Sequence, residues 1–360
     1  MLTEKIKVLV VDDSALIRSL LSEIINRSPD MVCVATAHDP LVARELIRNL
    51  NPDVITLDIE MPRMDGIEFL SRLMRLRPTP VVMISTLTQE GADVTLKALA
   101  LGAVDFVTKP RWGLTAGVQE LADQIVEKIR VAALATVKRL PDTSSLMMPT
   151  LLEPQVANPL GRSAQDKLIC IGSSTGGTEA VKVILQALPA DVPPVLIVQH
   201  MPPGFTASFA KRLNQVCRLT VKEASHREHL LPGHAYVAPG GWQMHIERQG
   251  VKYQVMVEDT PAVNRHKPSV DVLFRSVAAQ AGSKAIGIML TGMGADGAHA
   301  MRVMRDAGSY NFVQDEASCV VFGMPREAIA QGAAHEVLPL TQIAPRLLEQ
   351  LNSQDTRLVD

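Results

Sequence analysis

The sequence predicts two α/β domains, each built on a mostly parallel sheet and joined by a linker. Short apolar runs alternate with amphipathic stretches up to about residue 130, and a second series of the same kind starts near residue 166. Between the two series the alternation stops, and prolines, serines and polar residues take over. Alternating strands and helices are typical of parallel sheets covered by helices on both faces. A chain of 360 residues is comfortable for two such domains.

The N-terminal series, residues 1–130, predicts a doubly wound, five-stranded parallel sheet. Lys7–Val11 has the pattern of a strand buried on both faces, and apolar residues at helical spacing follow it. The other strand candidates are Met31–Ala35, Val54–Leu57, Val81–Ile84 and Phe106–Val107. Residues 131–165 are predicted to be an interdomain linker. Its apolar cluster Leu146–Met148 is expected to dock on a surface that the sequence does not specify.

The C-terminal series, residues 166–352, predicts a Rossmann-like domain with a mostly parallel sheet, and residues 353–360 are expected to form a tail. Buried strands are expected at Leu168–Ile171, Val195–Val198 and Ala285–Leu290. Two further strands, near Ala235–Ala238 and Tyr253–Val257, come with glycine-rich turns. We expect these two strands to form an antiparallel excursion.

The composition excludes several classes of protein. A net charge of −2 lacks the basic surplus of a nucleic-acid binder. The four cysteines are far apart and form no C-x-x-C pair, which favours reduced thiols over disulfides or a metal site. No signal-peptide core and no apolar stretch of membrane-spanning length is present. We therefore expect a cytoplasmic monomer that does not insert into membranes.

Charged and polar residues gather at the predicted strand ends of the N-terminal domain. Asp12 and Asp13 follow the first strand and Asp58 the third, while Ser85 ends the fourth and Lys109 the fifth. Carboxylates sharing one crevice repel unless a cation compensates, and Mg²⁺ prefers oxygen ligands. Singly, Asp13 could be a helix N-cap, Lys109 a surface lysine and Ser85 a loop residue. Jointly, they favour a site where a carboxylate accepts a phosphoryl group that the hydroxyl and the ammonium bind.

Four motifs carry a resemblance here: Val10–Ser14, Leu57–Pro62, Met64–Gly66 and Thr108–Pro110. They are similar to those of the receiver domain of bacterial response regulators, over residues 5 to about 130. The resemblance implies that a histidine kinase phosphorylates Asp58, with Mg²⁺ bound by Asp12, Asp13 and Asp58. It also implies that Ser85 and Lys109 sense the phosphoryl group, and it places Phe106 at the family's aromatic switch position.

The second domain has a candidate nucleophile at a strand-to-helix turn. Residues 172–176 read Gly-Ser-Ser-Thr-Gly, with the spacing G-x-S-x-G. Such a turn lifts a hydroxyl above the sheet, and the helix N-terminus favours developing negative charge. A serine needs a base, and His200 ends the next buried strand. Asp296 lies in a glycine-rich loop after another buried strand, where it can orient the imidazole.

Taken alone, these spacings leave other interpretations open. The turn resembles a dinucleotide-binding loop, but it lacks G-x-G-x-x-G, and the next strand ends in a histidine rather than an acid. His200 can be a satisfied strand-end histidine, and Asp296 can cap the helix that begins near Gly297. His226 and His229 suggest a metal, but no third ligand accompanies them. Spacing therefore leaves the triad and its alternatives evenly balanced.

Longer motifs add a second resemblance: Ile171–Gly177, Gln199–Pro202, Asn264–Asp271 and Leu290–Gly297. They are similar to those of the chemotaxis protein-glutamate methylesterase family, and with the receiver in front the resemblance spans nearly the whole chain. It implies a phosphorylation-activated serine hydrolase that removes glutamyl methyl esters from chemoreceptors during adaptation. Many members also deamidate receptor glutamines. No cofactor is expected in this domain.

The resemblance also implies roles for individual residues. Ser174, His200 and Asp296 correspond to the catalytic triad. Met293 takes the oxyanion-stabilising place through its backbone N–H, and Thr175 and residues 264–269 line the site. The family often has a small residue without a hydroxyl where this chain has Ser173, so Ser174 is assigned as the nucleophile because it precedes Thr-Gly-Gly. The main alternative is a receiver joined to a non-enzymatic protein-binding module.

Overall fold

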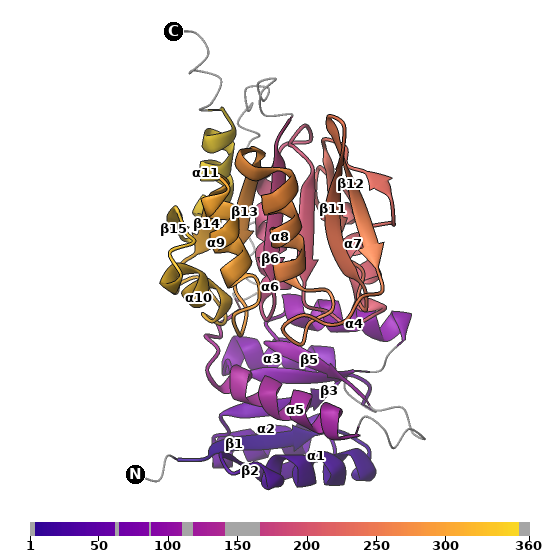
Figure 1. The fold of residues 1–360 in the computed structure, drawn as a ribbon. Coiled ribbons are helices and arrows are strands. Elements are labelled where there is room, and N and C mark those ends of the chain that lie inside the picture. Colours follow the sequence, from indigo (N-terminus) through magenta and orange to yellow (C-terminus); the bar gives the residue numbers. More distant parts are fainter. Residues whose placement is uncertain (1–3, 62–64, 86–87, 110–117, 141–165, 353–360) are drawn as a thin grey trace. The chain divides into compact units, whose positions relative to one another are not determined.

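The computed structural model describes residues 4–61, 65–85, 88–109, 118–140 and 166–352, and the chain divides into two compact units near residue 149. The predicted tail and the cluster Leu146–Met148 lie outside the described residues. None of the described helices combines the length and the apolar character that a membrane span requires. Each unit is built on its own sheet (Figure 1).

The N-terminal unit has the predicted five-stranded parallel sheet, with strand order β2-β1-β3-β4-β5. Its strands are β1 (Ile6–Val11), β2 (Met31–Ala37), β3 (Val54–Asp58), β4 (Val81–Ser85) and β5 (Asp105–Thr108). Its helices are α1 (Ala15–Arg27), α2 (Pro40–Leu50), α3 (Gly66–Leu76), α4 (Gln89–Ala100) and α5 (Val118–Ala133). The order reverses between β1 and β3, so the ends of these two strands border the crevice where sites form in such sheets.

Side-chain caps fix where several helices of this unit begin. Ser14 accepts a hydrogen bond from the Ile17 N–H, Asp39 caps α2, Asp65 caps α3 and Thr88 caps α4. Each cap satisfies a backbone donor that the first helical turn leaves without a partner. The alternative that Asp13 is the cap of α1 is wrong, because Ser14 holds that position. Asp13 is therefore not needed to begin the helix.

The C-terminal unit has a seven-stranded sheet in the order β15-β14-β13-β6-β7-β10-β8, and every neighbouring pair is parallel. Its strands are β6 (Leu168–Ser173), β7 (Val195–Gln199), β8 (Thr220–Glu223), β10 (His234–Val237), β13 (Ala285–Met289), β14 (Tyr310–Gln314) and β15 (Glu336–Leu338). The helices are α6 (Gly177–Ala187), α7 (Phe205–Val216), α8 (Val270–Gln280), α9 (Ala298–Asp306), α10 (Met324–Ala330) and α11 (Leu340–Asn352), with a 3₁₀ turn at Gly282–Lys284. The order reverses between β6 and β13.

A second, three-stranded antiparallel sheet joins β11 (Gln243–Gln249), β12 (Lys252–Glu258) and β9 (Glu228–His229). The expected antiparallel excursion is therefore correct for Tyr253–Val257 and wrong for Ala235–Ala238. The latter segment forms β10, which pairs in parallel with β7 and β8. Helix α8 packs on β11 and attaches the small sheet to the unit.

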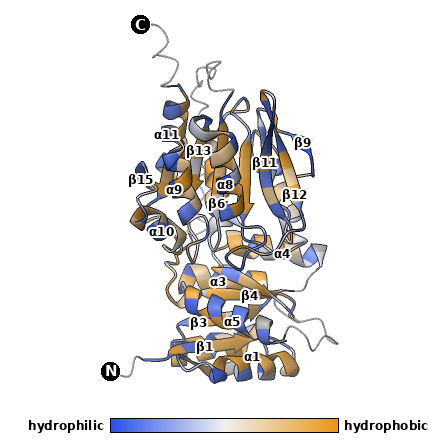
Figure 2. Cartoon of the chain, viewed as in Figure 1, coloured by the Kyte–Doolittle hydropathy of each residue, from blue (hydrophilic) through white to orange (hydrophobic). Residues whose placement is uncertain are grey.

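Apolar strands form the core of each unit. In Figure 2 the central strands are coloured mainly hydrophobic. The residues of β6, β7 and β13 are all buried, which explains why they appear in the sequence as continuous apolar runs. Burial on both faces holds these strands in fixed register, so the polar residues that follow them are fixed as well.

Candidate active site

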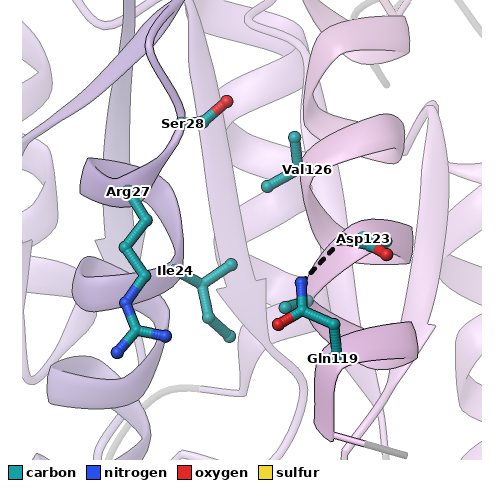
Figure 3. A pocket seen from close by; sticks show the side chains of 7 residues that line it. Ile24, Arg27, Ser28, Gln119, Asp123 and Val126 are labelled. Atoms are coloured by element: carbon teal, nitrogen blue, oxygen red, sulfur yellow. Dashed lines mark hydrogen bonds between the residues drawn. The ribbon is translucent and has the colours of Figure 1, made fainter.

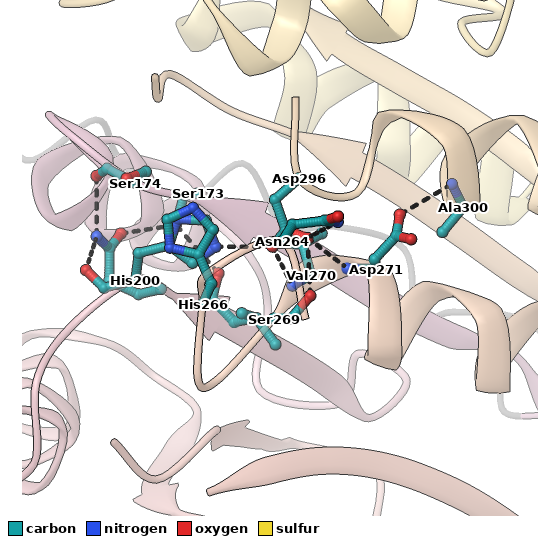
Figure 4. Close-up of polar contacts among 12 residues, drawn as sticks. Ser173, Ser174, His200, Asn264, His266, Ser269, Val270, Asp271, Asp296 and Ala300 are labelled. Atoms are coloured by element: carbon teal, nitrogen blue, oxygen red, sulfur yellow. Dashed lines mark hydrogen bonds and ion pairs between the residues drawn. The ribbon is translucent and has the colours of Figure 1, made fainter. Parts of the chain in front are cut away.

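Three adjacent strands bring the candidate triad to one edge of the seven-stranded sheet. Ser174 follows β6, His200 follows β7, and Asp296 lies in the loop between β13 and α9. These strands are neighbours in the order β13-β6-β7, and all run parallel, so their carboxyl ends meet. Figure 4 shows the labelled side chains of the three loops gathered in one place. The structure thus brings together the residues that the sequence predicted to meet.

The turn that holds Ser174 is anchored on its backbone. The Ser174 N–H donates to the Thr291 carbonyl at 3.0 Å. Gly176 has a φ of 78° at the N-cap of α6, a conformation that a glycine adopts without steric cost. A Cβ on Gly292 would lie 2.8 Å from Ser174 Cβ, so only a glycine lets the two loops approach this closely. Ser174 itself is half-buried.

Asp296 is a buried carboxylate surrounded by fixed donors. Its Oδ1 accepts from Asn264 Nδ2 at 2.8 Å and from Ser269 Oγ at 2.7 Å. Its Oδ2 accepts from the Val270 N–H at 2.7 Å and from His200 Nε2 at 2.8 Å. Val270 begins α8, so Asp296 lies at the N-terminus of that helix, where an anion is favoured. The alternative that Asp296 caps the helix near Gly297 is wrong, because the N-cap of α9 is Gly297 without a side-chain bond.

These donors set the charge of Asp296. Burial alone would raise the pKa of this carboxyl, but the hydrogen bond and charge of His200, together with Asn264 and Ser269, lower its pKa to about 2. An ionised carboxylate can only accept hydrogen bonds, so His200 must donate through Nε2–H. His200 Nδ1 is buried and has no hydrogen-bond partner among the described residues. In the neutral form of the ring, the basic lone pair is therefore on Nδ1.

A second histidine covers the His200 ring. His266 stacks on it with ring centroids 3.7 Å apart and an interplanar angle of 8°. The loop that carries His266 is strained at Asn264 and Arg265, which both have positive φ. Gln243 Nε2 donates to the His266 carbonyl at 3.0 Å and helps to hold the loop in place. The segment 264–269 therefore contributes to the site through His266, Asn264 and Ser269.

The loop predicted to stabilise an oxyanion lies beside the nucleophile. Met293 is half-buried and follows Gly292, which contacts Ser174. The Thr291 hydroxyl donates to the Thr175 carbonyl at 3.0 Å and ties this loop to the nucleophile turn. Met293 and Thr175 thus lie on loops that flank Ser174, where the sequence predicted them.

Two polar residues of this site were missed by reasoning from the sequence. Gln199 precedes His200 and donates through Nε2 to the Ser174 carbonyl at 2.8 Å. Thr291 joins the loops after β6 and β13. Gln199 is a polar residue at the end of an otherwise apolar strand, which is a signal that could have identified it. His226, by contrast, accepts a backbone hydrogen bond from Val257, and neither His226 nor His229 belongs to a metal-binding group of the described residues.

The N-terminal unit places its acidic residues at the reversal between β1 and β3. Ligand oxygens of Asp12, Asp13 and Asp58 lie within 4.8 Å of one another, as a single cation would require. Lys109 Nζ lies 2.8 Å from Asp58 Oδ2 and 3.3 Å from Asp12 Oδ2. Ser85 is fully buried at the end of β4, and its hydroxyl lies 2.6 Å from that of Thr95. The four charged residues therefore converge as a cluster, and Ser85 ends the strand next to that of Asp58 with its hydroxyl directed to Thr95.

Charge is less well compensated in this cluster. Burial, with a smaller contribution from the Asp12 charge, raises the pKa of Asp58 to about 6 against the opposing hydrogen bond and charge of Lys109. Burial also raises the pKa of Asp12. Burial acts to lower the pKa of Lys109, but the hydrogen bonds and charges of Asp58 and Asp12 raise it above its usual value. The donor set of carboxylate oxygens with excess negative charge fits a hard divalent cation.

Phe106 and a pocket are two further features of the N-terminal unit. Phe106, on β5, is buried, and Lys128 Nζ lies 5.4 Å from its ring centroid. A pocket between α1 and α5 is lined by apolar residues that include Ile24 and Val126 (Figure 3). Gln119 and Asp123 also line it, and Gln119 Nε2 donates to Asp123 over 3.0 Å. The residues that line this pocket lack the convergent charged groups found at the strand ends.

Both units match known protein families. Residues 169–347 match the CheB methylesterase family and residues 8–116 match the response regulator receiver domain. An Albidiferax ferrireducens protein named protein-glutamate methylesterase/protein-glutamine glutaminase 1 is 64% identical over 359 residues, covering 98% of this chain and 96% of that protein. A Burkholderia lata protein, named protein-glutamate methylesterase/protein-glutamine glutaminase 3, is 57% identical over 358 residues, covering 99% of this chain and 98% of that protein.

A solved structure resembles the C-terminal unit. The crystal structure of the Thermotoga maritima CheB methylesterase catalytic domain superposes with a TM-score of 0.50 at 39% identity, covering 51% of this chain and 98% of that chain. Sequence similarity across nearly the full length and the fold of the C-terminal unit therefore point the same way. The chain belongs to the protein-glutamate methylesterase/protein-glutamine glutaminase family, with a receiver domain ahead of a CheB methylesterase domain.

Proposed function

We propose that this chain is a serine hydrolase that removes methyl esters from glutamyl residues of chemoreceptor cytoplasmic domains, in the adaptation of bacterial chemotaxis. One observation carries the proposal: His200 is bonded at 2.8 Å to a carboxylate that other fixed donors already hold, at the sheet edge that also carries Ser174. A base oriented by a permanent anion beside a hydroxyl is the arrangement that acyl transfer requires.

The geometry supports a specific assignment of protons. Ser174 Oγ attacks the ester carbonyl while His200 Nδ1 takes the hydroxyl proton, and Asp296 stabilises the resulting imidazolium through Nε2–H. Backbone donors including the Met293 N–H hold the oxyanion, with Thr175 lining the site. The imidazolium returns the proton to departing methanol. Water then attacks the acyl-enzyme with His200 again as base, which releases glutamate and restores Ser174.

The same groups support deamidation of receptor glutamines. Ser174 attacks the side-chain amide carbon, the C–N bond breaks, and His200 protonates the departing amine so that ammonia leaves. Hydrolysis of the same acyl-enzyme yields glutamate. Because amides are less reactive than esters, we expect this activity to be the slower of the two.

The N-terminal unit is the regulatory part of the proposal. A carboxylate oxygen of Asp58 attacks the phosphorus of a kinase phosphohistidine, and the P–N bond breaks. Mg²⁺, which Asp12, Asp13 and Asp58 would hold, supplies positive charge for the phosphoryl oxygens. Lys109 and Ser85 bind phosphoryl oxygens, and Phe106 is the switch residue. Phosphorylation biases a two-state receiver and raises the hydrolase activity of the chain.

The proposed partners are chemoreceptor cytoplasmic domains and a chemotaxis histidine kinase, so the proposed compartment is the cytoplasm. The alternative, a non-enzymatic protein-binding output, is disfavoured because Asn264, Ser269 and the Val270 N–H hold Asp296 in place to orient the His200 ring. A binding module would have no need of that arrangement.

Methanol release from methylated receptor fragments tests the proposal. Wild type and Ser174→Ala are compared, each with and without Mg²⁺ and a small phosphodonor. We expect release that rises with the phosphodonor and falls to background in the variant. If Ser173→Ala abolishes release while Ser174→Ala retains it, the nucleophile is misassigned. Absence of release from every methylated receptor would refute the substrate.

A further inference from the structure

A buried pair beside the nucleophile has no part in the chemistry described above. Ser173 and Gln199 are opposite each other in the parallel pairing of β6 and β7, and they are 0% and 3% exposed. Ser173 Oγ donates to Gln199 Oε1 at 2.7 Å. Gln199 Nε2 donates to the Ser174 carbonyl at 2.8 Å and to the His200 carbonyl at 3.3 Å. One amide therefore bonds to the backbone of both the nucleophile and the base.

We infer that Gln199 is a positioning residue that fixes the peptide between Ser174 and Thr175, and that Ser173 locks the orientation of its amide. This inference rests on the proposed function of Ser174. The amide cannot rotate by half a turn without cost, since Oε1 would then face two carbonyl oxygens and lose the Ser173 proton. The two carbonyls thus determine which end of the amide reaches Ser174, and the Ser173 hydroxyl holds the Oε1 end in place.

The surroundings leave the amide little room to move. A Cβ on Gly177 would lie 2.2 Å from Gln199 Oε1 and 2.7 Å from Ser173 Cβ, so the first turn of α6 packs directly on the pair. The Gly177 N–H also donates to the Ser174 carbonyl at 2.8 Å. The Ser174 carbonyl is therefore held by one backbone donor and one side-chain donor, and Gln199 supplies the second.

Holding this carbonyl has a consequence on the other side of the peptide. A trans peptide is planar and directs its N–H opposite to its C=O, so the Ser174 carbonyl and the Thr175 N–H turn together. In serine hydrolases with this turn, the N–H after the nucleophile is one of the groups that can stabilise an oxyanion. Gln199 therefore orients the Ser174 backbone and the Thr175 N–H at once, without touching substrate.

The test measures Ser174 reactivity by two independent routes. Methanol release gives kcat and KM, and inactivation by phenylmethanesulfonyl fluoride, followed by mass spectrometry of the Ser174 peptide, needs no receptor. For Gln199→Met, which keeps side-chain length and removes both hydrogen-bonding groups, we expect kcat and the inactivation rate to fall about 30-fold. KM is expected to stay within about twofold, and the apparent pKa of the rate profile to stay unchanged, because the bond between His200 and Asp296 is intact.

Ser173→Ala is a milder variant that tests the same idea. It should lower both rates about threefold, because the amide loses its lock but keeps its donor. The double variant should be no slower than Gln199→Met, because Ser173 acts through Gln199. Asn311→Ala is the matched control, since this fully buried amide bonds the Met301 and Ala333 carbonyls away from Ser174. It should lower the melting temperature and leave both rates within about twofold.

Inactivation of Gln199→Met at the wild-type rate would overturn the inference, whatever the substrate proves to be. A KM increase with unchanged kcat would overturn it as well, because the residue would then act in binding. If Gln199→Met does not fold, equal inactivation rates for Ser173→Ala and wild type would refute the claim that Ser173 holds the Gln199 amide. Wild-type labelling of Ser174 without methanol release from any receptor would count against the proposed substrate only, and the inactivation rates would still decide the role of Gln199.

Discussion

The two units bury a carboxylate at the same kind of place and give it opposite properties. Asp58 and Asp296 each lie at the carboxyl edge of a parallel sheet, and each is 2% exposed. Yet the pKa of Asp58 is raised to about 6 by burial, whereas that of Asp296 is lowered to about 2, because its hydrogen bonds outweigh the same effect. Equal burial therefore does not determine the charge of these groups.

The difference lies in where the compensating charge comes from. Asp296 has donors that belong to the fold: the N-terminus of α8, Ser269, Asn264 and His200. In the described part of the chain, Asp58 has one ammonium group, Lys109, within ion-pair distance, and Asp12 and Asp13 nearby add negative charge. A permanently compensated anion suits the orientation of a catalytic base. A poorly compensated one suits a site that takes up a cation and a phosphoryl group reversibly.

The largest effect should come from removing the charge of the compensated anion. We expect Asp296→Asn to lower kcat for methanol release about 1,000- to 10,000-fold, because the imidazolium loses its partner and the ring tautomer is no longer fixed. Asp58→Asn should instead lose the response to phosphodonor. Steady-state kinetics on both variants separates these outcomes. If Asp296→Asn retains a tenth or more of the wild-type kcat, His200 does not depend on Asp296.

The next largest effect should come from metal removal, which we expect to impair the Asp58 site and not the Asp296 site. With EDTA, labelling of Asp58 by a small phosphodonor is expected to fall at least about 100-fold, since Lys109 is then the one cation that the described residues place beside Asp58. Methanol release by a fragment starting at Asp166 should change less than about twofold, because its anion is compensated by the fold. Adding Mg²⁺ back is the control for the first measurement. Equal loss of both activities would contradict the division.

Sequence patterns were sufficient to predict the edges where both sites lie. The strands that lead to Asp12, Asp58, Ser174 and His200 are buried on both faces, so they appear as apolar runs that end at the functional residue. What remained hidden was the compensation of Asp296. Ser269 and Val270 lie 27 and 26 residues away from it, and only the packing of α8 makes them its donors.

The local sequence pattern also could not predict whether the short strand β10 pairs in parallel or antiparallel fashion. β10 is four residues long, and its sequence His-Ala-Tyr-Val is compatible with either direction. Its pairing with β7 and β8 is decided by partners distant in the chain and by burial against them. Glycine-rich turns nearby suggested a hairpin because they are common there, but they do not determine the partner.

The free energy of unfolding of the C-terminal unit should fall at acid pH as Asp296 loses its charge. The pKa of Asp296 is about 2 in the folded chain and about 3.9 in an unfolded one, so its charge stabilises the fold above pH 4. This contribution, about 3 kcal/mol, is lost as the pH falls from about 4 through about 2. Urea unfolding of Trp112→Phe, which leaves Trp242 as the single tryptophan, follows the C-terminal unit. In Asp296→Asn that part of the acid dependence should be missing; the same dependence in both chains would contradict the assignment.

The smallest expected effect tests a single donor. Ser269→Ala removes one hydrogen bond at 2.7 Å to the buried Asp296 and should lower the free energy of unfolding by about 1.5 kcal/mol at neutral pH. Because the lost bond favours the charged form, the pKa of Asp296 should rise, and the acid transition should move to higher pH. Ser309→Ala is the matched control: its hydroxyl is equally buried and donates at 2.7 Å, but to the neutral Gly282 carbonyl. Ser309→Ala should lower the free energy of unfolding without moving the pH of the acid transition. Equal shifts of that pH in the two variants would mean that fixed donors do not set the charge of Asp296.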